Sequence, residues 1–268
     1  RTVAIASVED MLKGSSNGLS SDIAQSGDLF ANIDLEFDPY DKYKKTQDIP
    51  LSELLALEKK SLGYYLSGHP VEAIENSIQK IRSKKISDLN QDTKKASLVC
   101  LINSVRQIKD KKGKPLTFIN FDDGSGVMDG IVAGETLEDC HNILKEGQIL
   151  VLKGAVEIDD FRSKDLGDAM YRMRVREVHS IDSELHKKIQ KIIVDIEKSD
   201  LSSLDNFSEK LDEIDSSFWS NGSCQLHIKV LTDQSEAIID IGDNYRFEPS
   251  LENLSFLKEL FGSEALEI

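Results

Sequence analysis

The chain has 268 residues, of which 39% are hydrophobic and 30% are charged, and its formal net charge is −15. This composition is typical of a globular protein with room for more than one compact domain, and no apolar run reaches the roughly 18 residues that a membrane-spanning helix needs. The sequence therefore predicts a cytoplasmic protein without membrane contact, and three widely spaced cysteines favour reduced thiols over a disulfide framework or a zinc site.

The negative charge is concentrated at the carboxyl end. Residues 1–93 carry 11 Lys and Arg against 15 Asp and Glu, and residues 94–181 carry 14 of each. Residues 182–268 carry 8 against 19, which is a net charge of −11. Because such a surface repels phosphate, we expect a protein partner for residues 182–268 and any nucleic-acid contact in the neutral middle.

The amino-terminal third is predicted to hold helices and a linker. Residues 1–13 resemble the end of a helix, and residues 14–50 have the Ser, Asn, Gly and Asp content of a flexible linker. Residues 51–95 predict a helical connector, with one helix from Leu51 and a second over 71–81, separated by a break at Pro70.

Residues 96–181 change to the two-residue period of strands. Two aspartates in the turn at 122–126 are interpreted as turn residues rather than a metal pair. The predicted elements are strands at 96–108, 116–121, 127–133, 148–158 and 169–181, with a short helix at 136–144. Five strands with a helix between the third and fourth predict a barrel of the oligonucleotide-binding (OB) type.

Residues 182–268 predict a small α+β domain, so the whole chain is expected to be a multi-domain protein of mixed class. An amphipathic helix is expected over 184–199, from the spacing of its leucine and isoleucines. Strands are expected at 224–231, 237–241 and 245–247, followed by a last helix over 251–261.

No catalytic motif is found in the chain. The phosphate-binding GxxxxGK[ST], the metalloprotease HExxH and the esterase GxSxG are all absent, and the five histidines are scattered. We therefore expect a non-catalytic binding segment without a metal or a cofactor.

Cations and two aromatic residues mark the barrel as a candidate surface for weak single-stranded DNA binding, which needs a cationic groove and rings that stack on bases. The candidate residues are Arg106, Lys109, Lys111, Lys112 and Lys114 near the first loop, Arg172, Arg174 and Arg176 on one face of the fifth strand, and Phe118 and Tyr171. The alternative is a solvated loop and arginines paired with Asp159, Asp160 and Glu177.

The linker contains an apolar pair, Leu29 and Phe30, within a segment that begins at Gln25. Adjacent apolar side chains in a flexible segment can anchor in a partner's pocket without a fold of their own. The alternative is that the pair packs on the chain's own domain.

Three segments together resemble the C-terminal region of bacterial DNA polymerase III alpha subunits. They are LEKKSLGYYLSGHP at 57–70, the strand and turn at 116–126, and FGSE at 261–264. The resemblance implies that residues 1–13 end a helix-hairpin-helix region and that the 14–50 linker docks on the beta sliding clamp. Its clamp-binding residues would be Gln25, Asp28, Leu29 and Phe30, although Gln25 stands one residue further from Leu29 than in the family pattern.

The resemblance also implies that the 96–181 barrel lies near template DNA and that residues 182–268 bind the tau subunit of the clamp loader through Leu257, Leu260 and Phe261. The nucleotidyl-transfer carboxylates of the family are expected upstream of this chain, which begins without Met. A different function remains open, since OB barrels also serve as tRNA-binding or RNA-binding accessory domains.

Overall fold

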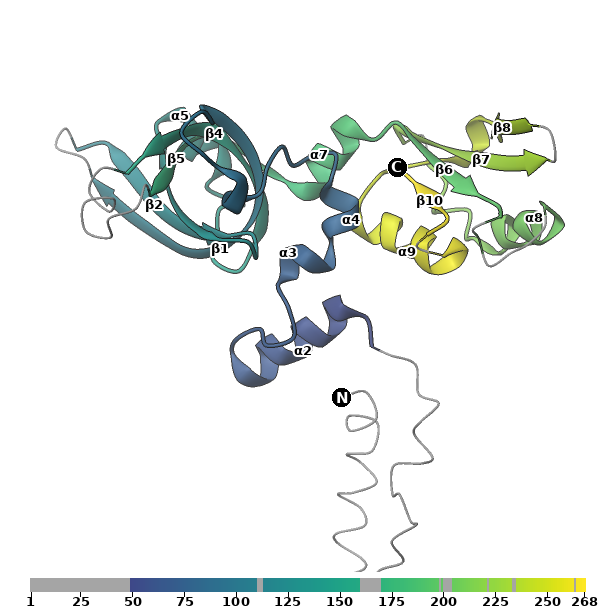
Figure 1. Ribbon diagram of the computed structural model, residues 1–268, viewed down its shortest axis with the longest axis horizontal. Coiled ribbons are helices and arrows are strands. Elements are labelled where there is room, and N and C mark those ends of the chain that lie inside the picture. The colour runs from purple at the N-terminus through teal and green to yellow at the C-terminus, as the bar shows by residue number, and fades with distance from the viewer. Residues whose placement is uncertain are drawn as a thin grey trace, which may run out of the picture. The chain divides into compact units, whose positions relative to one another are not determined.

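The computed structural model describes residues 49–109, 113–159, 170–197, 199, 204–220, 222–232, 235–262 and 264–268. The chain divides into two compact units between Ser67 and Gly68 (Figure 1). The expected helix end at 1–13 and the expected clamp-binding segment lie outside the described residues.

In the first unit, helix α2 (Leu51–Leu62) is followed by a tight turn. Gly63 has a φ of 82°, and its N–H donates to the Lys59 carbonyl at 3.1 Å, which ends the helix. The Glu58 carboxylate then accepts hydrogen bonds from the backbone N–H groups of Leu66 (2.7 Å) and Ser67 (2.9 Å). The conformation of this turn is therefore fixed by a side chain of the helix it follows.

The second unit begins with a connector of short helices, α3 (Pro70–Ala73), α4 (Glu75–Ile78) and the 3-10 turn η2 (Ile86–Asp88). The prediction of one continuous helix over 71–81 is wrong. The backbone leaves the helical conformation at Ile74, with φ −112° and ψ 9°. Within the connector, the Arg82 guanidinium forms a bidentate ion pair with the Glu75 carboxylate, at 2.6 and 2.9 Å.

Five strands close into a barrel in the order β1-β2-β3-β5-β4, in which β3 and β5 are parallel and all other pairs are antiparallel (Figure 1). The elements are β1 (Lys95–Lys109), β2 (Pro115–Asp122), β3 (Val127–Ala133), α5 (Glu135–Cys140), β4 (Ile149–Ile158) and β5 (Tyr171–Ser180). The predicted OB-type barrel, with its helix between the third and fourth strands, is confirmed.

The barrel closes because β1 is long enough to pair with two strands. Its first half, 95–101, pairs with β4, and its second half, 101–109, pairs with β2, with a bulge between Ile102 and Ser104 where the strand bends. Alternate side chains point inward, and the largest fully buried ones in the barrel core are Leu98, Ile102, Ile119, Phe121, Met128, Leu152 and Met173.

A second, five-stranded sheet follows, in the order β10-β6-β7-β8, with β9 paired to β7. Its strands are β6 (Lys191–Asp195), β7 (Cys224–Thr232), β8 (Ser235–Asp240), β9 (Arg246–Phe247) and β10 (Leu266–Glu267). The helices are α7 (Ile181–Lys188), α8 (Leu204–Glu213), the 3-10 turn η3 (Asp243–Tyr245) and α9 (Leu251–Phe261). The expected α+β class and the last helix are confirmed.

The predicted amphipathic helix over 184–199 is correct at its start and wrong beyond Lys188. Helix α7 ends at Lys188, and the three consecutive apolar residues Ile192, Ile193 and Val194 form β6, which pairs in parallel with β7. All three are buried, as in a strand covered on both faces. Their spacing from Leu185 also fits a helical period, so the sequence pattern alone favoured the wrong element.

The core of the second sheet extends to the outer side of the barrel. Buried Val99 of β1 and Val151 of β4 belong to the same cluster as Val71 and Ile78 of the connector and Leu185 of α7. Cysteines 100, 140 and 224 are free and buried, as predicted. No helix within the described ranges is long and apolar enough to cross a bilayer.

Candidate nucleic-acid interface

The side chains of β2 alternate between the barrel core and its outer face. Thr117, Ile119 and Phe121 are buried, whereas Phe118 points outward and is 38% exposed. An exposed ring in the middle of a strand has no packing role that the core requires. Phe118 is therefore available as a platform for a flat ligand group.

The strand register places a cation on each side of Phe118. Arg106 of β1 is the cross-strand neighbour of Phe118, which on its other side neighbours Ile131 of β3. Ile131 in turn neighbours Arg174 of β5. Opposed side chains on one face lie about 5 Å apart. We name Arg106, Phe118, Ile131 and Arg174 the Phe118 row, in which an apolar centre is flanked by two guanidinium groups.

One carboxylate serves two arginines of β5. Glu157 of β4 lies 3.1 Å from Arg174 Nε and 3.7 Å from an amino group of Arg172. The sequence alternative expected Asp159, Asp160 and Glu177 as partners. The structure pairs Arg172 and Arg174 with Glu157, and Asp160 lies outside the described residues. Exposed ion pairs of this kind contribute about 0–1 kcal/mol, so a phosphate can replace the carboxylate.

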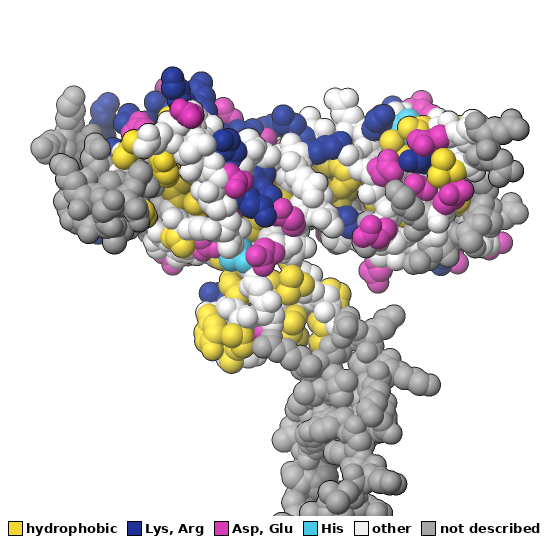
Figure 2. All heavy atoms as spheres, in the orientation of Figure 1, with side chains coloured by type: hydrophobic (Ala, Val, Ile, Leu, Met, Phe, Trp, Pro, Cys, Tyr) yellow, Lys and Arg dark blue, Asp and Glu magenta, His cyan; other side chains and the backbone are white. Residues whose placement is uncertain are grey.

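The cations of the first loop extend this surface. Arg106 and Lys109 are exposed, and neither has a carboxylate partner in the part of the chain that the structure describes. Lys114 is also exposed, and Lys111 and Lys112 lie outside the described residues. Figure 2 shows Lys and Arg side chains on the upper part of the barrel, with Asp and Glu side chains among them.

Tyr171 and Arg176 lie away from the Phe118 row. Tyr171 is half-buried and packs against the barrel core, on the opposite side of β5 from Arg172 and Arg174. Arg176 is exposed and follows Arg174 along the strand, next to a bulge in the pairing with β4. The predicted shared face of the three arginines is observed, but the predicted stacking ring on that strand is not part of it.

The acidic turn between β2 and β3 anchors the connector. Asp123 is 3% exposed and accepts hydrogen bonds from the Ile86 N–H (2.8 Å) and from Ser125. Asp122 contacts His69, whose Nδ1 accepts from the Val71 N–H at 3.2 Å. These contacts account for both carboxylates without a metal ion.

The electrostatics of Asp122 reflect the same contacts. Burial raises the pKa of Asp122, but hydrogen bonds from His69 and Asn103 outweigh this effect and hold it below its ordinary value of 3.8. Within the described residues, no three His, Cys, Asp or Glu side chains group as a metal site would require. The contacts of Asp123 with Ile86 and of Asp122 with His69 give the turn a structural role.

The predicted tau-binding residues lie mostly inside the α+β domain that contains the second sheet, residues 182–268, which we call the second domain. Leu257 and Phe261 are fully buried, and Leu260 packs partly buried against the same core. The ring of Phe261 stacks on Phe207 of α8, with centroids 5.1 Å apart. These side chains hold α9 in place, whereas Phe256 on the same helix is 39% exposed.

Sequence reasoning missed an aromatic groove beside Phe256. The groove has a volume of about 580 Å³ and is lined by Ile214, Phe218 and Phe256 together with Asp215 and Glu252. Phe218 packs on Phe256 with ring centroids 5.2 Å apart, and the neighbouring Trp219 meets Phe218 edge-on. The available signal was an adjacent aromatic pair in an acidic loop.

Comparison with known proteins identifies relatives over the whole chain, although no family model matches it. The DNA polymerase III subunit alpha of Pseudomonas fluorescens is 24% identical over 270 residues, which cover 98% of this chain and 22% of that protein. The corresponding subunit of Neisseria meningitidis serogroup A is 34% identical over 146 residues, 53% of this chain and 12% of that protein. The chain thus spans less than a quarter of the length of these relatives.

Two solved structures are also similar in part. One is the SSB domain of a Synechococcus sp. protein, at 12% identity and a TM-score of 0.28, covering 34% of this chain and 99% of that chain. The other is a replication protein A heterotrimer bound to ssDNA, at 13% identity and a TM-score of 0.30, covering 58% of this chain and 36% of that chain.

The resemblance to DNA polymerase III alpha subunits that the sequence motifs indicated is confirmed by the relatives.

Proposed function

We propose that this chain, which is homologous to about 22% of the length of DNA polymerase III alpha subunits, is the non-catalytic C-terminal portion of such a subunit in the cytoplasm. In this proposal the barrel binds single-stranded DNA weakly, and the segments on either side of it tether the polymerase to the sliding clamp and to the tau subunit of the clamp loader.

The Phe118 row carries the proposal for DNA. Proteins that bind single strands without sequence preference combine a cationic path for the backbone with rings on which bases stack, and each stacked base is worth about 1–3 kcal/mol. Arg106, Phe118 and Arg174 supply this combination on neighbouring strands. Because Phe118 is the one ring in the row, we expect weak and strongly salt-dependent binding.

The test uses the whole chain and a labelled thymidine oligonucleotide of about 16 nucleotides, the upper end of the site sizes known for one OB fold. Fluorescence anisotropy measures its affinity for the native chain and for Phe118→Ala. We expect about a tenfold loss, since removal of one stacking platform corresponds to about 1–3 kcal/mol. Val127→Ala removes a side chain that is 58% exposed on β3 and serves as the matched control.

Equal affinities of native and Phe118→Ala chains would contradict DNA binding at this row. An RNA oligonucleotide of the same length is the second ligand. Markedly tighter binding of the RNA would favour the RNA-binding accessory function instead, because only a site that contacts the 2′-hydroxyl makes that distinction.

For the tethers, we propose that Gln25, Asp28, Leu29 and Phe30 dock on the clamp and that residues 182–268 bind tau. Support for the second comes from the net charge of −11 over 182–268 and from the groove beside Phe218 and Phe256, which suits an apolar segment with basic flanks. Leu257, Leu260 and Phe261 would then support this surface from beneath rather than form it.

The clamp tether is tested by Leu29→Ala combined with Phe30→Ala. We expect the double variant to lose binding to immobilised clamp and to keep binding to tau, because the two sites lie in different segments of the chain. Unchanged clamp affinity in a biosensor assay would refute the docking role of this pair.

A further inference from the structure

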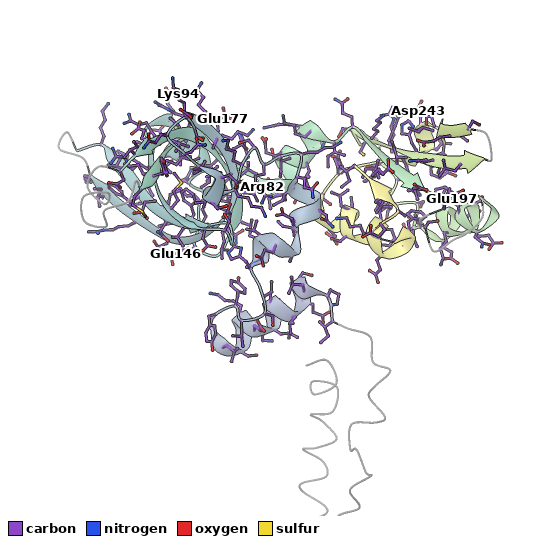
Figure 3. All side chains as sticks on the ribbon, viewed as in Figure 1. Arg82, Lys94, Glu146, Glu177, Glu197 and Asp243 are labelled. Carbon is purple, nitrogen blue, oxygen red and sulfur yellow. The ribbon has the colours of Figure 1, made fainter. Side chains whose placement is uncertain are left out.

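A groove with a volume of about 590 Å³ lies on the outer side of the barrel, where β4 runs between β1 and β5. Gly154 and Ala155 of β4 line it, with Lys95 of β1 and Arg176 of β5 on either side. This volume is within the range of ligand sites in proteins, about 300–1,000 Å³. Figure 3 shows Glu177, another lining residue, at the outer surface of the barrel, and labels Lys94, which precedes β1.

A bulge shapes the groove. The pairing of β4 with β5 shifts between Lys153 and Gly154, so that Arg176 and Glu177 are both exposed. The two strands approach so closely there that a Cβ on Gly154 would stand 2.3 Å from the carbonyl oxygen of Arg174. A glycine is therefore required at the centre of the bulge.

The two cations on either side of the groove, Lys95 and Arg176, are available to bind an anion. Neither Lys95 nor Arg176 has a carboxylate partner among the described residues. Lys153, by contrast, is bound to the buried carboxylate of Glu184 and lies 3.9 Å from Glu177. An arginine and a lysine on either side of an open groove, without acidic partners, form a site that favours phosphate.

The groove is continuous with the Phe118 row. Arg174, the last residue of the row, is the cross-strand neighbour of Ala155, and Ala155 is the neighbour of Lys95. The register thus leads from Phe118 on β2 across β3 and β5 to the groove on β4. Three strand spacings of roughly 4.8 Å give about 14 Å along this path.

We infer that this groove binds a second stretch of the same single strand, so that DNA held at Phe118 continues around the barrel and places a phosphate between Lys95 and Arg176. The inference rests on the proposed DNA binding at the Phe118 row. At the rise of about 3.4 Å per nucleotide of a stacked strand, the path accommodates about four nucleotides. The groove therefore contributes only to ligands that are longer than the Phe118 site itself.

The experiment compares two thymidine oligonucleotides: one of about 2 nucleotides, which is too short to reach the groove from Phe118, and one of about 16 nucleotides, the upper limit of site size for one OB fold. The variant combines Lys95→Ala with Arg176→Ala in the whole chain. The matched control, Lys80→Ala with Lys145→Ala, removes two positive charges at exposed positions outside the groove lining. Anisotropy gives the affinities over a series of salt concentrations.

We expect the groove variant to bind the long oligonucleotide about tenfold more weakly than the native chain, and the short one with unchanged affinity. The slope of log K against log salt for the long ligand should become shallower by about 0.7, the contribution of the one phosphate contact that is lost. The control variant should bind the short ligand as the native chain does, and its loss of affinity for the long ligand should be far smaller than that of the groove variant.

Two results would overturn the inference. One is equal loss for the groove and control variants, which indicates a general charge effect. The other is binding of thymidine monophosphate that the groove variant abolishes, which indicates a pocket for a free nucleotide. Phe118→Ala separates this inference from the function on which it rests: if that variant weakens both oligonucleotides and the groove variant weakens neither, only the groove is refuted.

Discussion

The barrel and the second sheet each have five strands, yet their charged side chains are arranged in opposite ways. On the barrel, one carboxylate, Glu157, lies within ion-pair distance of two arginines, Arg172 and Arg174. On the second sheet, one cation, Lys229, lies within 3.3 to 3.8 Å of three carboxylates, those of Asp195, Glu236 and Glu267. Positive charge is in excess at the first site, and negative charge at the second.

The net charge of a segment therefore does not show how its charged side chains are distributed over the surface. Residues 94–181 are neutral overall, with 14 charges of each sign, but the barrel places exposed cations around Phe118 and uses aspartates such as Asp123 inside a structural turn. The acidic second domain instead exposes carboxylates beside aromatic rings. This arrangement agrees with the proposal of a nucleic-acid partner for the barrel and a protein partner for residues 182–268.

The largest expected effect comes from comparing the buried and the exposed face of helix α9. Phe261→Ala should lower the free energy of unfolding by about 3–5 kcal/mol, because the ring is fully buried. Phe256→Ala should lower it by about 0.5–1.5 kcal/mol, the range for an aromatic pair contact, because its ring is 39% exposed. Urea unfolding followed by circular dichroism measures both. A larger loss for Phe256→Ala would mean that the two faces of α9 have been assigned the wrong way round.

That contrast also shows what the sequence could predict. The helix over 251–261 follows from its apolar spacing, but the spacing does not say whether Leu257 and Phe261 cover the chain's own core or a partner. The same limit extended the predicted helix at 184–199 beyond Lys188, where pairing with the distant strand β7 decides the conformation of Ile192 and Ile193.

In the candidate site, local alternation was enough to place Arg172, Arg174 and Arg176 on one face, and the same alternation puts Tyr171 on the other. Phe118 was found from its residue type alone. Its neighbours Arg106 and Ile131 are set by strand register, which depends on contacts between distant segments and on the bulge near Ile102. The Phe118 row therefore required the structure.

An intermediate effect concerns the buried charge between the two regions of the second unit. Glu184 of α7 is fully buried and binds Lys153 of β4 and Lys187. Burial raises the pKa of Glu184, but the hydrogen bonds from Lys153 and Lys187 outweigh it and hold the pKa below its ordinary value of 4.5. Glu184→Gln should reduce the free energy of unfolding at neutral pH by about 1.5–3 kcal/mol, the range for a hydrogen bond to a charged group.

The sign of the pH effect follows from the lowered pKa. The contribution of Glu184 is fully present above the pKa of the unfolded chain and is lost as the pH falls through the lower folded pKa. Chemical unfolding between about pH 6 and pH 3 should therefore show a shallower loss of stability in Glu184→Gln than in the native chain. Glu138→Gln, at an exposed position of α5 outside this network, is the control. Parallel curves for all three chains would contradict the role given to Glu184.

The smallest expected effect uses the one tryptophan of the chain as a reporter. Trp219 meets Phe218 edge-on, and Phe218 lines the groove of the second domain. Titration with tau should change the emission of Trp219, whereas titration with a thymidine oligonucleotide should leave it unchanged. A change with DNA alone would show that the two regions do not separate their partners.

The most direct test of DNA binding at the Phe118 row is a photo-cross-link. An oligonucleotide that carries bromodeoxyuridine is irradiated with the whole chain, and the cross-linked peptide is identified by mass spectrometry. We predict cross-links within β2, at Phe118, which disappear in Phe118→Ala while the thermal unfolding of the variant stays unchanged. Cross-links confined to the second domain, or cross-links at β2 that persist without the ring, would contradict the account.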